Sequence, residues 1–139
     1  MKGGCACGAI RYRFDSEPFD TSWCHCRNCQ KISDAPAAVY TMLARDGFVI
    51  EEGKKHLGSV KLTDFAERVF CMKCGSPLAT KLVEQPSTID VTVASLDDPS
   101  LLPPEFHIFC QSKIRWMTIE DGLPRYPRNR RDGTQVPQA

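Results

Sequence analysis

Apolar and polar side chains alternate over much of this chain with a period of two. Residues 9–14 read Ala-Ile-Arg-Tyr-Arg-Phe, which is the pattern of a half-buried strand. Residues 37–43 are almost continuously apolar and predict a buried strand, and residues 48–51 predict another before the Glu52-Gly53 turn. Further strands are predicted at residues 57–62, 68–70, 77–82, 88–96, 106–111 and 114–119. Because a helical period is nearly absent, the pattern predicts a mainly β fold.

Breaks in this pattern predict loops and one short helical turn. Residues 15–20 include Pro18 and predict a loop. Residues 30–33 predict a helical turn, which Asp34 and Pro36 would end.

The chain gives no sign of a second domain. It has 139 residues, no internal repeat and no linker, which suits a single domain. Beyond Tyr126 it is mostly Pro, Arg, Gly and Gln, with only Val136 to bury. We therefore expect one β domain over residues 1–127 and a flexible basic tail over residues 128–139.

Charge is distributed unevenly along the chain. The formal net charge is +1, from 18 basic and 17 acidic residues. Residues 124–139 hold four of the arginines and one aspartate, which leaves 14 basic and 16 acidic residues, a net charge of −2, in the body. An acidic body argues against general nucleic-acid binding, although the arginine-rich tail keeps this as the weakest alternative.

The composition predicts a soluble, cytoplasmic protein without a membrane segment. The chain opens with Met1-Lys2-Gly3-Gly4-Cys5 and has no apolar signal region there. Its longest largely apolar run, residues 35–44, is too short to cross a bilayer. In a reducing compartment, cysteines serve as metal ligands or redox groups rather than as disulfides.

The cysteines are grouped in a way that suits metal binding. They form a pair, a triple, a second pair and a singleton: Cys5 and Cys7; Cys24, Cys26 and Cys29; Cys71 and Cys74; and Cys110. In extended backbone a C-x-C pair directs both sulfurs to one side, and a turn after Cys26 would bring the third sulfur of the triple to the same centre. Zinc fits such thiolates best, because it accepts sulfur ligands in a tetrahedron.

Two zinc ions per chain give the simplest partition of these thiols. Joining the two pairs would close a four-cysteine site and would leave the triple with a metal of its own. Spacing alone does not exclude joining the triple to a different pair. An iron-sulfur cluster at the triple lacks ferredoxin-like spacing, and a thioredoxin role for Cys71 and Cys74 lacks a βαβ setting.

The fourth corner at the triple decides between a catalytic and a structural site. Closed structural zinc sites use four protein ligands, whereas catalytic sites leave one position open. Cys110 as a fourth ligand would close the site, but its default interpretation is a buried free thiol. His25 lies between two ligands in extended chain and should point away from the metal, and His107 is expected in the core or at its rim.

Seven motifs in order along residues 3–127 point to a known family. They are Gly4-Cys5-x-Cys7-Gly8, Cys24-His25-Cys26-x-x-Cys29, Arg68-x-Phe70-Cys71-x-x-Cys74-Gly75-Ser76-x-Leu78, Leu96-Asp97-Asp98-Pro99, His107-Ile108, Lys113-x-x-Trp116 and Asp121-Gly122-Leu123-Pro124. This pattern resembles the glutathione-dependent formaldehyde-activating enzyme family, which also includes centromere protein V. Two departures are Asp34, where the family commonly has glycine, and Cys110, where an aliphatic residue is usual.

The resemblance implies a fold and a set of metal ligands. The fold would be the β-tent, a set of coiled antiparallel sheets shared with methionine sulfoxide reductase B. A structural zinc would be held by Cys5, Cys7, Cys71 and Cys74, and a catalytic zinc by Cys24, Cys26 and Cys29. The implied activity is that of a carbon-sulfur lyase, which joins glutathione and formaldehyde to give S-hydroxymethylglutathione. The alternative is a non-catalytic zinc-stabilised module that binds another protein.

The ligand type agrees with that activity. A zinc ion with three thiolates carries a net charge of −1, so it suits a substrate thiol better than it suits making hydroxide from water. The carboxylates of an incoming glutathione would need cations, and Arg27 and Lys31 are the nearest in sequence. Trp23 and Trp116 could line the site or fill the core.

Overall fold

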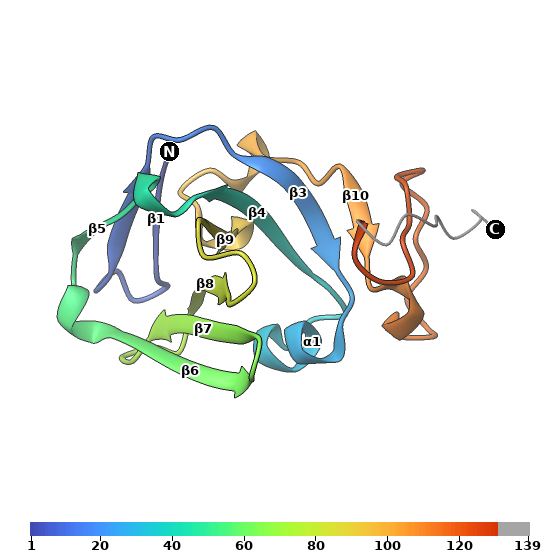
Figure 1. Ribbon diagram of the computed structural model, residues 1–139, viewed down its shortest axis with the longest axis horizontal. Helices are drawn as coiled ribbons and strands as arrows, with labels where there is room; N and C mark the ends of the chain where they lie inside the picture. The colour runs from blue at the N-terminus through green and yellow to red at the C-terminus, as the bar shows by residue number, and fades with distance from the viewer. Residues whose placement is uncertain (131–139) are drawn as a thin grey trace. The chain divides into compact units, whose positions relative to one another are not determined.

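The computed structural model describes residues 1–130 (Figure 1). The chain falls into two compact units. Unit 1 comprises Met1–Phe19 and Thr41–Leu102; unit 2 comprises Asp20–Tyr40 and the described chain from Pro103 onward. Each unit is assembled from separate stretches of sequence, which explains why no linker marks them. The fold is mainly β, as predicted. Among residues 1–130, α1 (Arg27–Ser33) is the sole α-helix, and no helix is long and apolar enough to span a membrane.

The first sheet of unit 1 has three antiparallel strands. Its order is β1 (Lys2–Gly4), β2 (Arg11–Phe14) and β5 (Phe48–Glu52). Tyr12 and Phe14 alternate with the two arginines of β2 and are fully buried, so the period of two in the sequence places one face of this strand in the core. The Tyr12 hydroxyl lies 2.6 Å from Ser95 Oγ, so its burial leaves no polar atom without a partner.

Four further strands of unit 1 are antiparallel neighbours. They are β6 (Leu57–Thr63), β7 (Ala66–Cys71), β8 (Pro77–Leu82) and β9 (Thr88–Thr92). The two strands of the β6–β7 hairpin lie side by side in Figure 1. Short connections join these strands. Cys71 ends β7, and Cys74 lies in the connection from β7 to β8.

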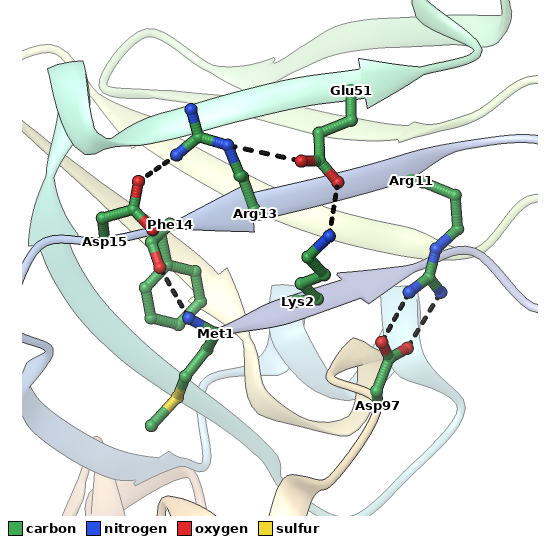
Figure 2. Close-up of polar contacts among 8 residues, drawn as sticks. All are labelled: Met1, Lys2, Arg11, Arg13, Phe14, Asp15, Glu51 and Asp97. Atoms are coloured by element: carbon green, nitrogen blue, oxygen red, sulfur yellow. Dashed lines mark hydrogen bonds and ion pairs between the residues drawn. The ribbon is translucent and has the colours of Figure 1, made fainter.

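Ion pairs connect side chains of β1, β2 and β5 with one another and with Asp97, all within unit 1 (Figure 2). The Arg11 guanidinium donates to both carboxylate oxygens of Asp97, at 2.9 and 2.5 Å, and these hydrogen bonds lower the pKa of Asp97. Glu51 on β5 pairs with Lys2 at 3.5 Å and with Arg13 at 3.3 Å. The strands β1, β2 and β5 are therefore joined by side chains as well as by their ladders.

Unit 2 contains one parallel strand pair, the helix and the start of another strand. β3 (Phe19–Cys24) pairs in parallel with β10 (Phe106–Ile108), so that Cys24 lies opposite Ile108. Helix α1 follows within three residues of β3. The helix ends at Asp34, which adopts a left-handed conformation with φ 51°. The next strand, β4 (Ala38–Ala44), begins in unit 2 and ends in unit 1.

The strand predictions hold where the alternation is clear. The predicted strands at residues 77–82 and 57–62 match β8 and β6. The predicted strand at residues 114–119 is wrong. Those residues include a turn in which Met117 N donates to Ile114 O at 3.1 Å. Lys113 Nζ donates to the carbonyl oxygens of Ile114 and Met117.

Other differences have a visible cause in the sequence. β3 begins at Phe19, inside the predicted loop of residues 15–20, and was not predicted because its buried positions include the polar Thr21 and Ser22. β1 has no apolar side chain to reveal it and forms by pairing with β2. The predicted strand at residues 88–96 ends at Thr92, where a 3-10 helix (Val93–Ser95) begins.

Gly53 provides a test of this fold. It has φ +75°, and a Cβ atom there would overlap the carbonyl oxygen of Ala9. Gly8 has φ +76° but open space around the same position. We expect Gly8→Ala to lower the free energy of unfolding by about 1–2 kcal/mol through backbone strain alone. Gly53→Ala should lower it by at least about 3 kcal/mol, since overpacking adds to the strain.

Urea denaturation of the two variants and the parent protein measures this difference. Equal losses in both variants would mean that the close approach of Ala9 to Gly53 does not exist in solution.

Candidate metal centres

Four cysteine sulfurs of unit 1 lie together. Cys5 and Cys7 follow β1, and Cys71 and Cys74 lie at the end of β7 and in the turn after it. Their Sγ atoms all lie within 4.8 Å of one another. Cys5 and Cys71 are buried, whereas Cys7 and Cys74 are exposed, so the cluster lies at the surface of the unit. The structure therefore brings the two cysteine pairs together, which their spacing in the sequence had left open.

Hydrogen-bond donors face these sulfurs. Ile10 N donates to Cys5 Sγ at 3.2 Å, and Ser76 Oγ lies 3.2 Å from Cys74 Sγ. The hydrogen bond with Ser76 lowers the pKa of Cys74 to about 5. Gly75 has φ +78°, which suits the tight turn that follows the pair. Donors directed at sulfur stabilise the thiolate form, which is the form that binds a metal.

The second cluster belongs to unit 2 and forms where β3 passes into α1. Cys24 is the last residue of β3, Cys26 is the N-cap of α1, and Cys29 lies in its first turn. The three Sγ atoms lie within 4.8 Å of one another. Cys29 N donates to Cys26 Sγ at 3.3 Å. The predicted turn after Cys26 is the start of this helix, which begins at Arg27 rather than at residue 30.

Crowding of three thiols in a buried place opposes their ionisation. Cys24 and Cys29 are buried and pack with Tyr40. Hydrogen bonds to Cys26 and Cys29, together with burial, raise the pKa of Cys24. Three thiolates this close repel one another, and a bound divalent cation is what would compensate for that repulsion. The donor set therefore fits a soft metal ion such as zinc.

Cys110 is not part of either cluster. Among residues 1–130, no fourth Cys, His, Asp or Glu ligand atom groups with the sulfurs of Cys24, Cys26 and Cys29. Cys110 starts a 3-10 helix (Cys110–Ser112) and is half-buried, and burial raises the pKa of its thiol. The thiol that was predicted to be buried is thus only partly enclosed.

His25 and His107 are connected to each other and to Asp121. His25 Nε2 lies 2.9 Å from His107 Nδ1, and His107 Nε2 lies 2.8 Å from Asp121 Oδ2. Both rings are buried, and burial lowers the pKa of His25 to about 4. Trp23 stacks on His107 at a centroid distance of 6.2 Å. The sequence indicated a packing or supporting role for His25, but nothing in it connected residues 25, 107 and 121.

The cations and aromatic residues expected near the triple have different surroundings. Arg27 and Lys31 are both exposed on α1, and Arg27 donates to the side-chain oxygen of Gln30. Trp116 is 73% exposed, so it does not fill a core. The sequence missed Phe109, which packs against the cysteine cluster and adopts a left-handed conformation with φ 55° that no pattern could reveal.

Comparison with known proteins gives a consistent result. A protein of Halomonas elongata, provisionally named as a glutathione-dependent formaldehyde-activating enzyme, is 27% identical over 127 residues, which cover 86% of this chain and 81% of that protein. A Schizosaccharomyces pombe protein named as an uncharacterized lyase is 30% identical over 77 residues, 55% of this chain and 54% of that protein. A crystal structure of a Rhodobacter sphaeroides protein matches with a TM-score of 0.62 and 24% identity, covering 73% of this chain and 94% of that chain, which shows a shared fold.

The family assignment depends on the length of the match. The family model for glutathione-dependent formaldehyde-activating enzymes matches residues 1–112, well over half of the chain and inclusive of both cysteine clusters. The chain therefore belongs to the glutathione-dependent formaldehyde-activating enzyme family.

Proposed function

We propose that this protein is a zinc-dependent carbon-sulfur lyase that adds the thiol of glutathione to formaldehyde, or catalyses the reverse cleavage. The observation that carries the proposal is the cluster of Cys24, Cys26 and Cys29, whose sulfurs lie within 4.8 Å of one another and provide three of the four corners of a tetrahedron. Family membership and the lyase name of one relative support the same class of reaction.

Two zinc ions per chain are part of this proposal. The four-cysteine cluster of unit 1 would hold a structural zinc, because it can fill every corner of the tetrahedron from the protein. The three-cysteine cluster of unit 2 would hold the zinc that takes part in the reaction. A reducing compartment such as the cytoplasm would keep all these thiols available to metal.

The reaction itself is a simple addition. Cys24, Cys26 and Cys29 would hold the zinc ion, which would supply the charge that favours the deprotonated form of a substrate thiol. The thiolate sulfur attacks the aldehyde carbon, a carbon-sulfur bond forms, and the π bond of the carbonyl breaks. The proton that left the thiol is balanced by the one taken up by the carbonyl oxygen, so the product is the S-hydroxymethyl adduct.

The protein residues around the triple would orient the substrates. Tyr40 and Phe109 pack against the cluster and would limit the access of water to it. Arg27 and Lys31 are cations on the helix that carries Cys29, and they would attract the carboxylates of glutathione. Oriented binding of this kind, rather than a protein acid or base, would then account for most of the rate increase.

Substitution of a proposed ligand tests the metal assignment. We expect Cys26→Ser to lower the zinc content from two ions per chain toward one, because three sulfur ligands at this centre become two. Inductively coupled plasma mass spectrometry on the purified protein measures this content. Cys110→Ser is the matched control and should keep both zinc ions, since Cys110 lies outside both clusters.

Two zinc ions in Cys26→Ser, or one in Cys110→Ser, would contradict the assignment of the three-cysteine cluster. The first result would remove Cys26 as a ligand, and the second would make Cys110 one.

The activity is tested against the reaction that occurs without enzyme. Exchange spectroscopy with ¹³C-formaldehyde and glutathione measures how fast the adduct forms and dissociates at equilibrium. We expect the zinc-loaded protein to increase this exchange rate at least about tenfold, because a positioned, deprotonated thiol removes much of the entropic and ionisation cost. Cys26→Ser should return the rate to the spontaneous value, whereas Cys110→Ser should not.

A non-catalytic role in protein binding remains the second candidate, and exposed apolar side chains of unit 1 favour it. These side chains are Val60, Leu62, Phe65 and Val83. Val83 N donates to Phe65 O at 2.9 Å, so two of them lie close together. If the zinc-loaded protein leaves the exchange rate unchanged, this candidate replaces the lyase.

A further inference from the structure

A hydrogen-bonded chain leads from an exposed carboxylate to the residue between two proposed zinc ligands. Asp121, with a side chain 39% exposed, lies 2.8 Å from Nε2 of the buried His107. His107 Nδ1 in turn lies 2.9 Å from Nε2 of His25. His25 is completely buried and lies between Cys24 and Cys26 in the sequence. None of these three residues has a role in the addition reaction proposed above.

The carboxylate fixes the tautomers of both rings. An ionised carboxylate can only accept, so His107 Nε2 must carry the hydrogen that it donates to Asp121. When the His107 ring is neutral, its Nδ1 is then an acceptor, and His25 Nε2 donates to it. His25 Nδ1 is left with a lone pair, and it is buried without a hydrogen-bond partner among the described residues. An unpaired buried nitrogen requires an explanation, and functional sites are where such groups are retained.

The main chain of His25 is held as firmly as its ring. Its N–H donates to Ile108 O at 3.0 Å, and its carbonyl accepts from Gln30 Nε2 at 2.8 Å. Gln30 is itself buried and also donates to Ser112 O at 3.1 Å. With its ring held by His107, His25 has fixed contacts at both peptide groups and at its side chain. The peptide groups of His25 are those that join it to Cys24 and Cys26.

We propose that Asp121 and His107 are positioning residues of the three-cysteine centre and that they act through His25. The proposal rests on the metal centre of the proposed function. By holding one tautomer of His25, they keep the backbone between Cys24 and Cys26 in the geometry that places both sulfurs on one metal. Groups that orient metal ligands from outside the ligand set commonly change metal affinity about 10–100-fold when they are removed.

Asp121→Asn tests this role with little change in shape. The amide can donate as well as accept, so it no longer enforces the tautomers. We expect ¹⁵N NMR of the rings to show altered protonation of His25 and His107, while His56 in unit 1 stays unchanged. Competition with a chelator, followed by zinc analysis, should show about 10–100-fold weaker zinc binding at one centre only. The amide signals of Gln30 and Gly75 identify which centre loses its metal.

Controls separate positioning from a general loss of structure. Glu120→Gln removes the same charge from the exposed neighbouring residue and should change neither the tautomers nor the affinity. Asp121→Glu should restore most of the affinity, because it again provides an obligate acceptor. His107→Phe keeps an aromatic ring beside Trp23 and removes both hydrogen bonds, so it should weaken the same centre.

Three results would overturn the inference. The first is a three-cysteine centre that binds zinc in Asp121→Asn as tightly as in the wild-type protein. The second is zinc binding that Glu120→Gln weakens as much as Asp121→Asn does. The third is loss of zinc from both centres in both Asp121→Asn and His107→Phe. A wild-type protein that binds only one zinc would instead defeat the proposed function, and this inference with it, so the two failures are distinguishable.

Discussion

Repulsion among closely packed thiols is the constraint on which the rest of the molecule depends. Seven of the eight cysteines lie in clusters whose sulfurs are within 4.8 Å of one another. Such groups cannot all ionise unless a cation compensates for their charge, and neutral thiols alone give little reason for strands and turns to converge on them. Both clusters could hold a metal ion, and binding one would add folding free energy to the unit that holds it.

Local backbone chemistry brings each set of sulfurs together. In unit 1, the chain after β1 and the turn after β7 meet, and glycines at positive φ close both turns. In unit 2 the change from strand to helix at Cys26 brings the three sulfurs together, because the period of a strand ends and that of a helix begins within the triple. The four-cysteine cluster could supply every corner of a tetrahedral metal site, whereas the three-cysteine cluster could supply three of the four.

Much of this arrangement could be predicted from the sequence, and the remainder depends on contacts distant in the chain. Spacing within C-x-C and C-x-x-C-G is local information, so the metal-chelating groups of cysteines could be predicted, and the alternation of apolar and polar residues predicted the mainly β fold. Which pairs join could not be predicted from spacing, because Cys5 and Cys7 meet Cys71 and Cys74 only in the folded chain. β3 was missed because Thr21 and Ser22 are polar yet buried, a consequence of packing that no alternation reveals. The connection of His25 to His107 and Asp121 spans more than eighty residues and depends on the parallel pairing of β3 with β10.

X-ray absorption at the zinc edge, with and without glutathione, tests the central claim most directly. Centres with four and three cysteine ligands give a mean of about 3.5 sulfur ligands per zinc in the free protein. The account predicts that glutathione raises this mean to about four, because its thiol takes the remaining position. A mean that is already four without glutathione, or that does not change when glutathione is added, would contradict it.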